Sequence, residues 1–545
     1  MQLFLASSLL AAVTASLAAP QAPVVDLGYA KYQGTVNRDT GNVQYLGVRY
    51  AAAPTGSLRW REPQAPKATS GVQLANKQPN TCMQAGNGAN TVSPFLNSTS
   101  LTRRQSDAPP ASEDCLFLNI AAPASGKKNL PVVIWIHPGG YTWGDAYHYT
   151  PEDLVNEAGG QVIAVAIQHR LGVFGFLSGQ EVHDGGVLNA GLLDQEFAFK
   201  WVQQHIGKFG GDPSKVTIWG DSSGAGSGLL HLISNNGNTH PRLFRGVITS
   251  SAFLPPLYPY NGRIPEEVFT DVVNQSGSHR CSSASDSLDC LRKADVDVIN
   301  QANNNITAEG FYGLLTFTPV VDGKLITDRP TELLRRGHLN GDAVLSVTNT
   351  FESGRPNLVD PSTADTVKIP EYIANLWPEL TEEQINAGAA LYENAGLGAP
   401  IDQAVAINSD SVFVCPTYWL LRALKGKGFK GEFAIPPGWH VNDLVYYFPN
   451  SLTGQQFSSP PFNNTEFRNN FAQSFLNFVI SQDPNVKWDH SNTLPQWPRW
   501  TSGGRAEMVF NKTEADEPVF KVTPTTDAFL KRCDYWESVG ANSGQ

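Results

Sequence analysis

One short run in the first half of the chain restricts its fold more than any other, because an apolar strand passes there into a helix through a tight turn. Lys215–Trp219 (KVTIW) has the β-branched composition of a buried strand, and a glycine-rich helical stretch extends from Ser223 to Ile233. The turn between them, Gly220-Asp221-Ser222-Ser223-Gly224, has the form G-x-S-x-G. Strand, turn and helix in this order are the context in which that pattern holds a serine above the end of a sheet strand. Ser222 is therefore a candidate nucleophile, and an ordinary glycine-rich turn is the alternative.

Strand-like and helix-like runs alternate around this segment. Further strands are expected at Leu130–Ile136, Gln161–Gln168, Phe244–Thr249, Ala343–Val347 and Glu432–Ile435, and helices at Gly191–Ile206 and Asn470–Ser481. Apolar strands that are buried on both faces and separated by helices indicate an α/β protein. The expected architecture is a large, mostly parallel central sheet flanked by helices.

Composition and charge exclude several classes of protein. Of the 545 residues, 41% are hydrophobic and only 16% charged, so the chain is not disordered. The net charge is −11, and no run of five Lys or Arg occurs, which argues against nucleic acid and anionic membrane surfaces as partners. Length alone would favour three or four domains.

The first residues have the composition of an export signal. Residues 2–19 form an apolar, Ser/Thr-containing run that ends in small residues, which predicts a signal peptide over 1–18 and a secreted protein. A membrane anchor is the alternative, although the run is short for one. No later stretch reaches the roughly 18 apolar residues needed to span a bilayer, so no integral membrane association is expected.

Cysteines and sequons agree with export. An even number of cysteines behind a signal peptide predicts disulfides, of which six cysteines allow fifteen connectivities. The cysteines are Cys82, Cys115, Cys281, Cys290, Cys415 and Cys533. None shows C-x-x-C spacing, so no metal site is expected. Five N-x-S/T sequons predict glycosylated, exposed loops. They begin at Asn97, Asn274, Asn305, Asn463 and Asn511.

A second glycine-rich turn follows the strand Leu130–Ile136. Acyl transfer through a tetrahedral intermediate requires N–H donors aimed at the developing oxyanion. In His137-Pro138-Gly139-Gly140-Tyr141, Pro138 has no N–H, but Gly139 and Gly140 can donate, and Ser223 supplies a third N–H at a helix N-terminus. A plain turn after a strand is the alternative.

A serine nucleophile also needs a histidine base and an acid that orients it. Glu352 and His440 each follow an expected strand, and the order Ser222, Glu352, His440 is that of α/β-hydrolases. The chain has eleven histidines, and periodicity alone does not select these two partners.

Several longer motifs resemble the type B carboxylesterase/lipase family, including its secreted fungal members. They are Gly47–Trp60, Ser112–Asn119, Arg170–Ser178, Asn189–Gln195 and Phe209–Gly224. The resemblance implies a single α/β-hydrolase domain over residues 19–545, with Ser222 as nucleophile, Glu352 as acid and His440 as base. It also implies the disulfides Cys82–Cys115, Cys281–Cys290 and Cys415–Cys533, the first closing a loop over the active-site mouth.

The predicted function is a secreted serine hydrolase of carboxylic esters that needs no cofactor and acts on small-molecule or lipid esters. The Cys82–Cys115 loop offers one apolar helical turn, at Val92, Phe95 and Leu96, and several prolines that limit a longer helix. This favours an esterase that acts on short- to medium-chain esters over a lipase with a lid. A lipase or sterol esterase acting on long-chain esters is the alternative, and a non-catalytic binding protein of the same fold is a remote one.

Overall fold

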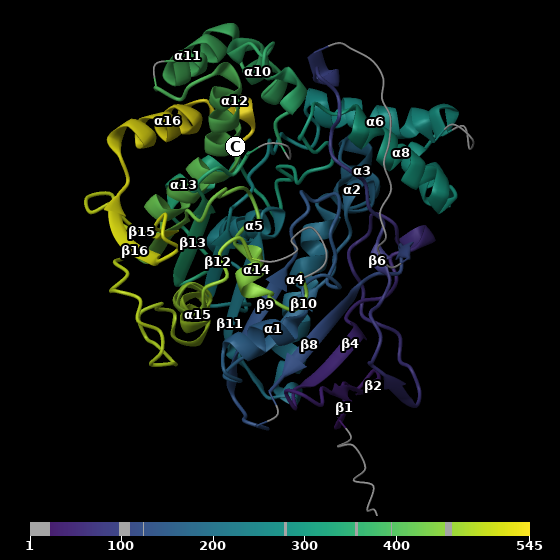
Figure 1. The fold of residues 1–545 in the computed structure, drawn as a ribbon. Helices are drawn as coiled ribbons and strands as arrows, with labels where there is room; N and C mark the ends of the chain where they lie inside the picture. Colours follow the sequence, from purple (N-terminus) through teal and green to yellow (C-terminus); the bar gives the residue numbers. More distant parts are fainter. Residues whose placement is uncertain are drawn as a thin grey trace, which may run out of the picture.

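The computed structural model describes residues 22–96, 110–123, 125–276, 281–354, 358–393, 395–452 and 460–545. An 11-stranded sheet in the order β16-β15-β14-β13-β12-β11-β9-β10-β8-β4-β3 runs through the molecule (Figure 1). Its central strands are β9 (Leu130–Ile136), β10 (Ile163–Ile167), β11 (Gly211–Asp221), β12 (Gly246–Ser250), β13 (Ala343–Asn349), β14 (Gly428–Phe433) and β15 (Ala506–Lys512). Every neighbouring pair among these seven is parallel. The expected α/β class and mostly parallel sheet are confirmed.

The two margins of the sheet are antiparallel, which the sequence patterns do not predict. The marginal strands are β8 (Phe117–Ala122), β4 (Val43–Arg49), β3 (Thr35–Val36) and β16 (Pro518–Pro524). β16 pairs antiparallel with β15, and none of its residues is fully buried. A strand of this kind carries no continuous apolar run, so its sequence gives little signal. Smaller sheets join β1 (Val24–Asp26), β2 (Lys31–Gln33) and β5 (Val72–Leu74), and β6 (Thr81–Cys82) with β7 (Ala111–Ser112).

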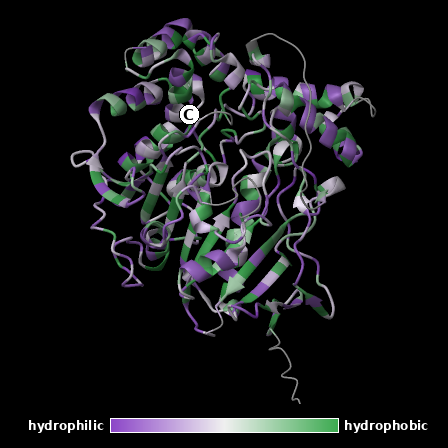
Figure 2. Ribbon diagram, in the orientation of Figure 1, coloured by the Kyte–Doolittle hydropathy of each residue, from purple (hydrophilic) through white to green (hydrophobic). Residues whose placement is uncertain are grey.

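Alternate residues of the central strands enter two different cores. In β9, Val132, Ile134 and Ile136 pack with α4 (Ala190–His205) and α5 (Ser223–Gly237). Val133 and Trp135 point to the other face, which α1 (Pro151–Glu157), α14 (Leu444–Tyr447) and α15 (Thr465–Ser481) cover. Because both faces of such a strand are buried, nearly all of its residues are apolar, and Figure 2 shows the central strands largely in green.

Further helices gather beyond one end of the sheet, at the top of Figure 1. They include α6 (Arg263–Gln275), α8 (Val296–Glu309), α10 (Ile369–Leu376), α11 (Glu382–Glu393), α12 (Pro400–Asn408), α13 (Cys415–Ala423) and α16 (Asp527–Ser538). Shorter helices are α2 (Gly172–Phe176), α3 (Gln180–Gly185), α7 (Ser287–Lys293), α9 (Pro330–Arg336) and α17 (Gly540–Ser543). Within the described residues, no helix combines the length and the apolar composition needed to cross a bilayer.

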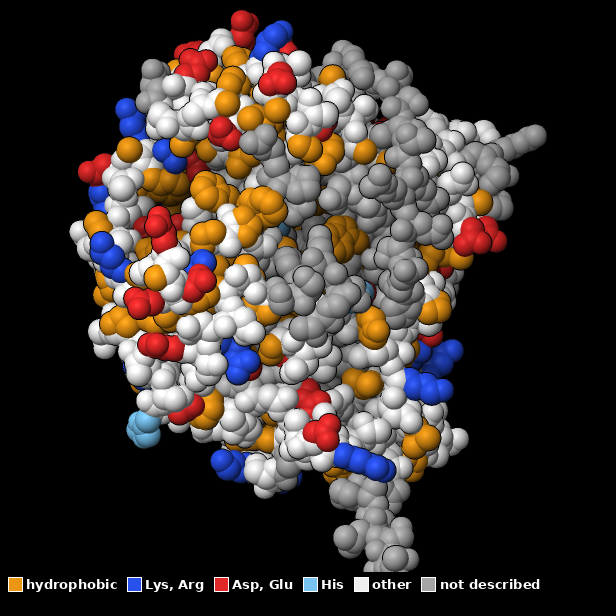
Figure 3. All heavy atoms as spheres, viewed as in Figure 1, with side chains coloured by type: hydrophobic (Ala, Val, Ile, Leu, Met, Phe, Trp, Pro, Cys, Tyr) orange, Lys and Arg blue, Asp and Glu red, His pale blue; other side chains and the backbone are white. Residues whose placement is uncertain are grey.

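The surface carries charges of both signs. Figure 3 shows Lys and Arg side chains interspersed with Asp and Glu over the viewed face, with hydrophobic side chains between them. Three sequon asparagines, Asn274, Asn305 and Asn463, are exposed, and Asn511 is half-buried. Only Asn463 lies in a loop as expected. Asn274 lies in α6, Asn305 in α8 and Asn511 in β15. A side chain on the outward face of a helix or strand can reach solvent as a loop side chain does, so an exposed sequon does not require a loop. Asn97 lies outside the described residues.

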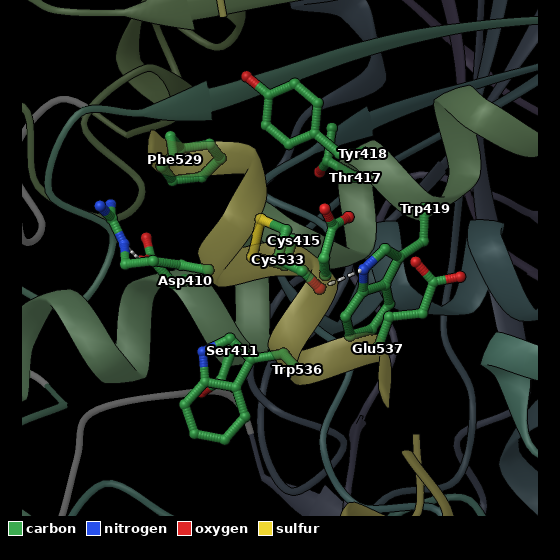
Figure 4. The surroundings of a disulfide bond; sticks show 12 residues. Asp410, Ser411, Cys415, Thr417, Tyr418, Trp419, Phe529, Cys533, Trp536 and Glu537 are labelled. Atoms are coloured by element: carbon green, nitrogen blue, oxygen red, sulfur yellow. Dashed lines mark hydrogen bonds and ion pairs between the residues drawn. A yellow bond between two sulfur atoms is a disulfide. The ribbon is translucent and has the colours of Figure 1, made fainter. Parts of the chain in front are cut away.

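The six cysteines form three disulfides in the pairing that the resemblance implies. Cys82 joins Cys115, Cys281 joins Cys290, and Cys415 joins Cys533. The third bond connects the first residue of α13 to the middle of α16 (Figure 4). Beside it, the indole N–H of Trp419 donates to the backbone oxygen of Cys533 at 3.2 Å.

Candidate active site

Ser222 occupies the turn between β11 and α5. Its φ of 53° and ψ of −121° are a conformation that side-chain-bearing residues rarely adopt, which is typical of strained functional turns. The turn is held from both sides, because Ser222 N–H donates to Ser250 O at 2.9 Å and Ser222 O accepts from Gly226 N–H at 2.8 Å. The local geometry is that of a nucleophile elbow.

Glycine is required on both sides of this serine. A Cβ atom at Gly220 would lie 2.2 Å from the backbone carbon of Gly224, and one at Gly224 would lie 2.1 Å from Ile136 O. Both distances are shorter than any van der Waals contact, so without a side chain Gly220 lets the turn close onto the start of α5, and Gly224 lets α5 pack against β9. The two glycines of the G-x-S-x-G pattern therefore have a direct steric cause.

The structure brings Ser222, His440 and Glu352 together from three separate loops. His440 Nε2 lies 2.9 Å from Ser222 Oγ, and His440 Nδ1 lies 2.7 Å from Glu352 Oε2. Glu352 follows β13 and is fully buried, and its other oxygen accepts from Asn349 N–H at 2.7 Å. His440 follows β14, and its ring packs on Phe413 with centroids 4.5 Å apart. The two ring nitrogens of the histidine thus face the serine and the carboxylate.

Gly139 and Gly140 lie in the loop after β9, both with positive φ, at +121° and +63°. A Cβ on Gly139 would lie 1.9 Å from Trp143 O, and one on Gly140 would lie 2.0 Å from Leu315 Cδ1. Among the described residues, no group accepts a hydrogen bond from the N–H of Gly139 or Gly140. Ser223 is the first residue of α5, so its N–H has no acceptor within the helix. All three N–H groups can therefore donate to a bound oxyanion.

Two stacked histidines pack beside the loop that contains Gly139 and Gly140. The rings of His137 and His169 are 4.6 Å apart and nearly parallel, and burial lowers the pKa of both. His137 Nδ1–H donates to the carbonyl oxygen of Pro138 at 2.9 Å. The neutral His137 ring thus fixes the peptide that precedes Gly139. Sequence reasoning did not identify this role, because His169 is remote in sequence from the loop.

Two buried carboxyl groups lie close to the histidine–glutamate pair. Burial raises the pKa of Asp221 well above its ordinary value, and nearby Asp443 and Glu352 raise it further. Burial and the charge of Glu352 raise the pKa of Asp443 to about 6. Both oxygens of Asp221 lack a hydrogen-bond partner among the described residues. In the sequence Asp221 is only a variable position of the G-x-S-x-G pattern, since burial of a charge is a property of the tertiary structure.

A site with this arrangement has what a serine hydrolase needs: a nucleophile, a base held by an acid, and free N–H donors. Within the part of the chain that the structure describes, no group of three or more His, Cys, Asp or Glu side chains is placed to hold a metal ion.

Comparison with known proteins agrees with the α/β-hydrolase fold and identifies the reaction as hydrolysis of carboxylic esters. Residues 21–536 match the Carboxylesterase family, so the chain belongs to the carboxylesterase family and is a carboxylic ester hydrolase. It is 29% identical to carboxylesterase patB of Aspergillus clavatus, over 98% of this chain and all of that one. It is 32% identical to the secreted triacylglycerol lipase LIP1 of Gibberella zeae, over 96% and 93% of the two chains. The crystal structure of Aspergillus niger EstA, 28% identical, has a TM-score of 0.82 over 96% of this chain and 99% of its own.

Proposed function

We propose that this protein is a secreted esterase that cleaves carboxylic esters through an acyl-enzyme on Ser222, with His440 as base and Glu352 as orienting acid. The observation that carries the proposal is the pair of hydrogen-bond contacts at His440, 2.9 Å to Ser222 Oγ and 2.7 Å to Glu352 Oε2. These contacts have the lengths that proton transfer between a nucleophile and its base requires.

In the proposed reaction, Ser222 Oγ attacks the carbonyl carbon of the ester while His440 Nε2 takes the hydroxyl proton. The carbonyl oxygen becomes an oxyanion, which the N–H groups of Gly139, Gly140 and Ser223 stabilise. His440 then donates the proton to the departing alcohol oxygen, and an ester bond to Ser222 remains. Water then attacks the acyl carbon while His440 takes one of its protons, the bond from that carbon to Ser222 Oγ breaks, and His440 returns the proton to Ser222 Oγ as the carboxylic acid leaves. Glu352 stabilises the imidazolium in both half-reactions.

The proposed substrates are dissolved short- to medium-chain esters. In the Cys82–Cys115 loop, the described residues contain one single-turn 3-10 helix, Pro94–Leu96, which is shorter than an amphipathic lid. The similarity to LIP1 of Gibberella zeae supports a second candidate, a lipase acting on long-chain esters. Acyl-chain length therefore separates the two candidates.

Export and domain organisation belong to the same proposal. Residues 1–18 act as a signal peptide, and residues 19–545 form one α/β-hydrolase domain, because a triad drawn from positions 222, 352 and 440 has to meet in one site. Three disulfides support an oxidising compartment. The sequon asparagines at 274, 305 and 463 are exposed enough to carry glycans.

The test replaces Ser222 by alanine. With p-nitrophenyl butyrate as substrate, Ser222→Ala should lower kcat by about 10³- to 10⁶-fold, because triad members act as a unit. Ser214→Ala, at an exposed serine, is the control and should keep wild-type activity. A radiolabelled organophosphate should modify the peptide that contains Ser222. Labelling of a different peptide, or full activity of Ser222→Ala, would refute the assignment.

A further inference from the structure

Gln545 has a fully buried side chain whose amide group joins two segments that are remote from each other in the sequence. It follows α17, and the label C in Figure 1 marks its place beside α12 and α13. Its Nε2 donates to Leu254 O at 2.7 Å and to Ser411 O at 2.8 Å. Leu254 and Ser411 are themselves fully buried, so this one amide satisfies two backbone carbonyls that water does not reach.

The carbonyl of Ser411 needs this donor because a proline removes the usual one. Ser411 lies in η7 (Ser409–Val414), a stretch of π-helix between α12 and α13. In a π-helix each N–H bonds the carbonyl five residues earlier, as Cys415 N–H does here with Asp410 O. By the same spacing Ser411 O would accept from Pro416, which has no N–H. A buried carbonyl without a partner is destabilising, so the side-chain amide takes the place of the missing donor.

Both segments that the amide joins reach the proposed triad. In η7, the ring of Phe413 packs on that of His440, with centroids 4.5 Å apart. After β12, Phe253 N–H donates to Ser222 O at 3.1 Å. The rings of Phe253 and Phe413 also pack on each other, with centroids 5.4 Å apart. Two neighbouring aromatic residues therefore support the base and the backbone of the nucleophile.

The alignment of the two segments depends on few hydrogen bonds. Leu254 N–H donates to Val412 O at 2.8 Å, and the amide of Gln545 adds a bridge between Leu254 O and the carbonyl of the residue before Val412. Without the bridge, η7 would keep one bond to the segment after β12 and carry an unpaired carbonyl. A shift of η7 would move the ring of Phe413, on which His440 rests.

We propose that Gln545 is a positioning residue for ester hydrolysis. Its amide aligns η7 with the segment after β12 and thereby fixes His440 relative to Ser222. The inference rests on the proposed function. A displacement of about 1 Å between reacting groups can lower a rate about 100-fold, so a residue that touches neither the substrate nor the triad can control the rate in this way.

The test replaces Gln545 by methionine, which is similar in size and has no N–H donor. With p-nitrophenyl acetate as substrate, Gln545→Met should lower kcat by about ten- to a hundredfold and leave KM within about twofold, because misalignment affects the transition state rather than the binding of a small ester. The assay is made well below the midpoint of thermal unfolding of the variant. An unchanged kcat in the folded variant would overturn the proposal.

Asn340 offers a matched control, because its buried Nδ2 also donates to two backbone carbonyls. These are His231 O at 2.9 Å and Ser234 O at 2.8 Å, towards the end of α5 that is remote from Ser222. Asn340→Leu should lower the midpoint of thermal unfolding, as Gln545→Met does, and keep kcat within about twofold of the wild type. An equal loss of kcat in both variants would show a general effect of destabilisation and would overturn the positioning role.

A second-site variant tests the route through η7. Pro416→Ala restores an N–H at the position from which Ser411 O would accept. In the Gln545→Met background it should raise kcat by about fivefold or more, and in the wild-type background it should change kcat by less than about twofold. A double variant with no recovery would contradict the proposed route.

If Gln545→Met fails to fold, Gln545→Asn replaces it in the same tests. Asparagine keeps the amide but is one methylene group shorter, so it should lower kcat by about threefold or more, with the same recovery by Pro416→Ala. An unchanged kcat would again overturn the proposal. Organophosphate labelling of Ser222 in the wild type reports separately on the proposed triad, since it does not depend on any Gln545 variant.

Discussion

At the scale of single residues, the negative charge near His440 depends on the ionisation of two fully buried carboxyl groups, those of Asp221 and Asp443. Asp443 is fully buried and lies near Glu352, and its Oδ1 accepts a hydrogen bond from Asn349 at 3.2 Å. Because its pKa is raised to about 6, Asp443 holds its proton up to a higher pH in the folded protein than in the unfolded chain. Ionisation of Asp443 would add a second negative charge near His440, which favours the imidazolium but costs folding free energy.

Proton binding and folding are linked, so the raised pKa of Asp443 sets how the free energy of unfolding changes with pH. The pKa of Asp443 is raised in the folded protein to about 6, whereas an unfolded aspartate titrates near 4. Between these values the folded state binds more protons, so stability falls as pH rises from about 4 to about 6, by roughly 3 kcal/mol in all. Asp443→Asn removes this dependence. Urea unfolding should give similar stability for wild type and variant near pH 4, and a more stable variant above pH 7.

The control for this prediction is Asp39→Asn, which replaces an exposed carboxyl. It should leave the difference between pH 4 and pH 7 as in the wild type. An Asp443→Asn protein that is less stable than the wild type at every pH would contradict the assigned cause.

At the scale of elements, the sequence predicted the features that contiguous residues form. It did not predict the features that form only when segments remote in sequence come together. β9 and β10 were expected because each is an uninterrupted apolar run buried on both faces. Ser222 was expected because its strand, turn and helix are contiguous. Glu352 and His440 required the family resemblance, since their meeting with Ser222 depends on the whole sheet.

The disulfides offer a prediction about elements. Cys415–Cys533 closes a separation of 118 residues, and Cys281–Cys290 one of 9. In the chain-entropy model, the longer loop makes Cys415–Cys533 about 2 kcal/mol more stabilising than Cys281–Cys290. The double variant Cys415→Ala/Cys533→Ala should therefore lower the midpoint of thermal unfolding more than Cys281→Ala/Cys290→Ala. The two double variants are controls for each other, and equal losses would refute the loop-length argument.

Non-covalent contacts bear on the size of this effect. Arg422 of α13 donates to Asp534 at 2.6 Å and to Glu537 at 2.9 Å, both in α16. These partly exposed pairs keep the two helices adjacent after the disulfide is removed, although pairs of this kind contribute only about 1 kcal/mol or less. We therefore expect the variant without Cys415–Cys533 to fold and to unfold at lower temperature.

At the scale of the whole molecule, the question is whether the enzyme meets its substrate in solution or at an oil surface. Three large apolar side chains next to the site are 38–53% exposed: Trp143, Phe351 and Trp439. Trp143 contacts Gly139, while Phe351 directly precedes Glu352 and Trp439 directly precedes His440. Phe351 and Trp439 lie side by side, joined by an isolated β-bridge, whereas Trp143 lies in the loop after β9. Over the face that Figure 3 shows, charged side chains of both signs lie among the hydrophobic ones. An oil surface would favour a continuous apolar face instead.

We therefore expect no marked interfacial activation. With tributyrin as substrate, the rate should approach saturation below the solubility limit and rise no further once droplets form, because a dissolved ester already reaches Ser222. Soluble p-nitrophenyl butyrate, assayed with and without a tributyrin emulsion, is the control: droplets should inhibit its hydrolysis only by competition. A sharp increase in rate at the solubility limit, or faster hydrolysis of long-chain triglycerides than of butyrates, would contradict this prediction. Either result would show that an apolar face forms at an interface and that the lipase candidate is correct.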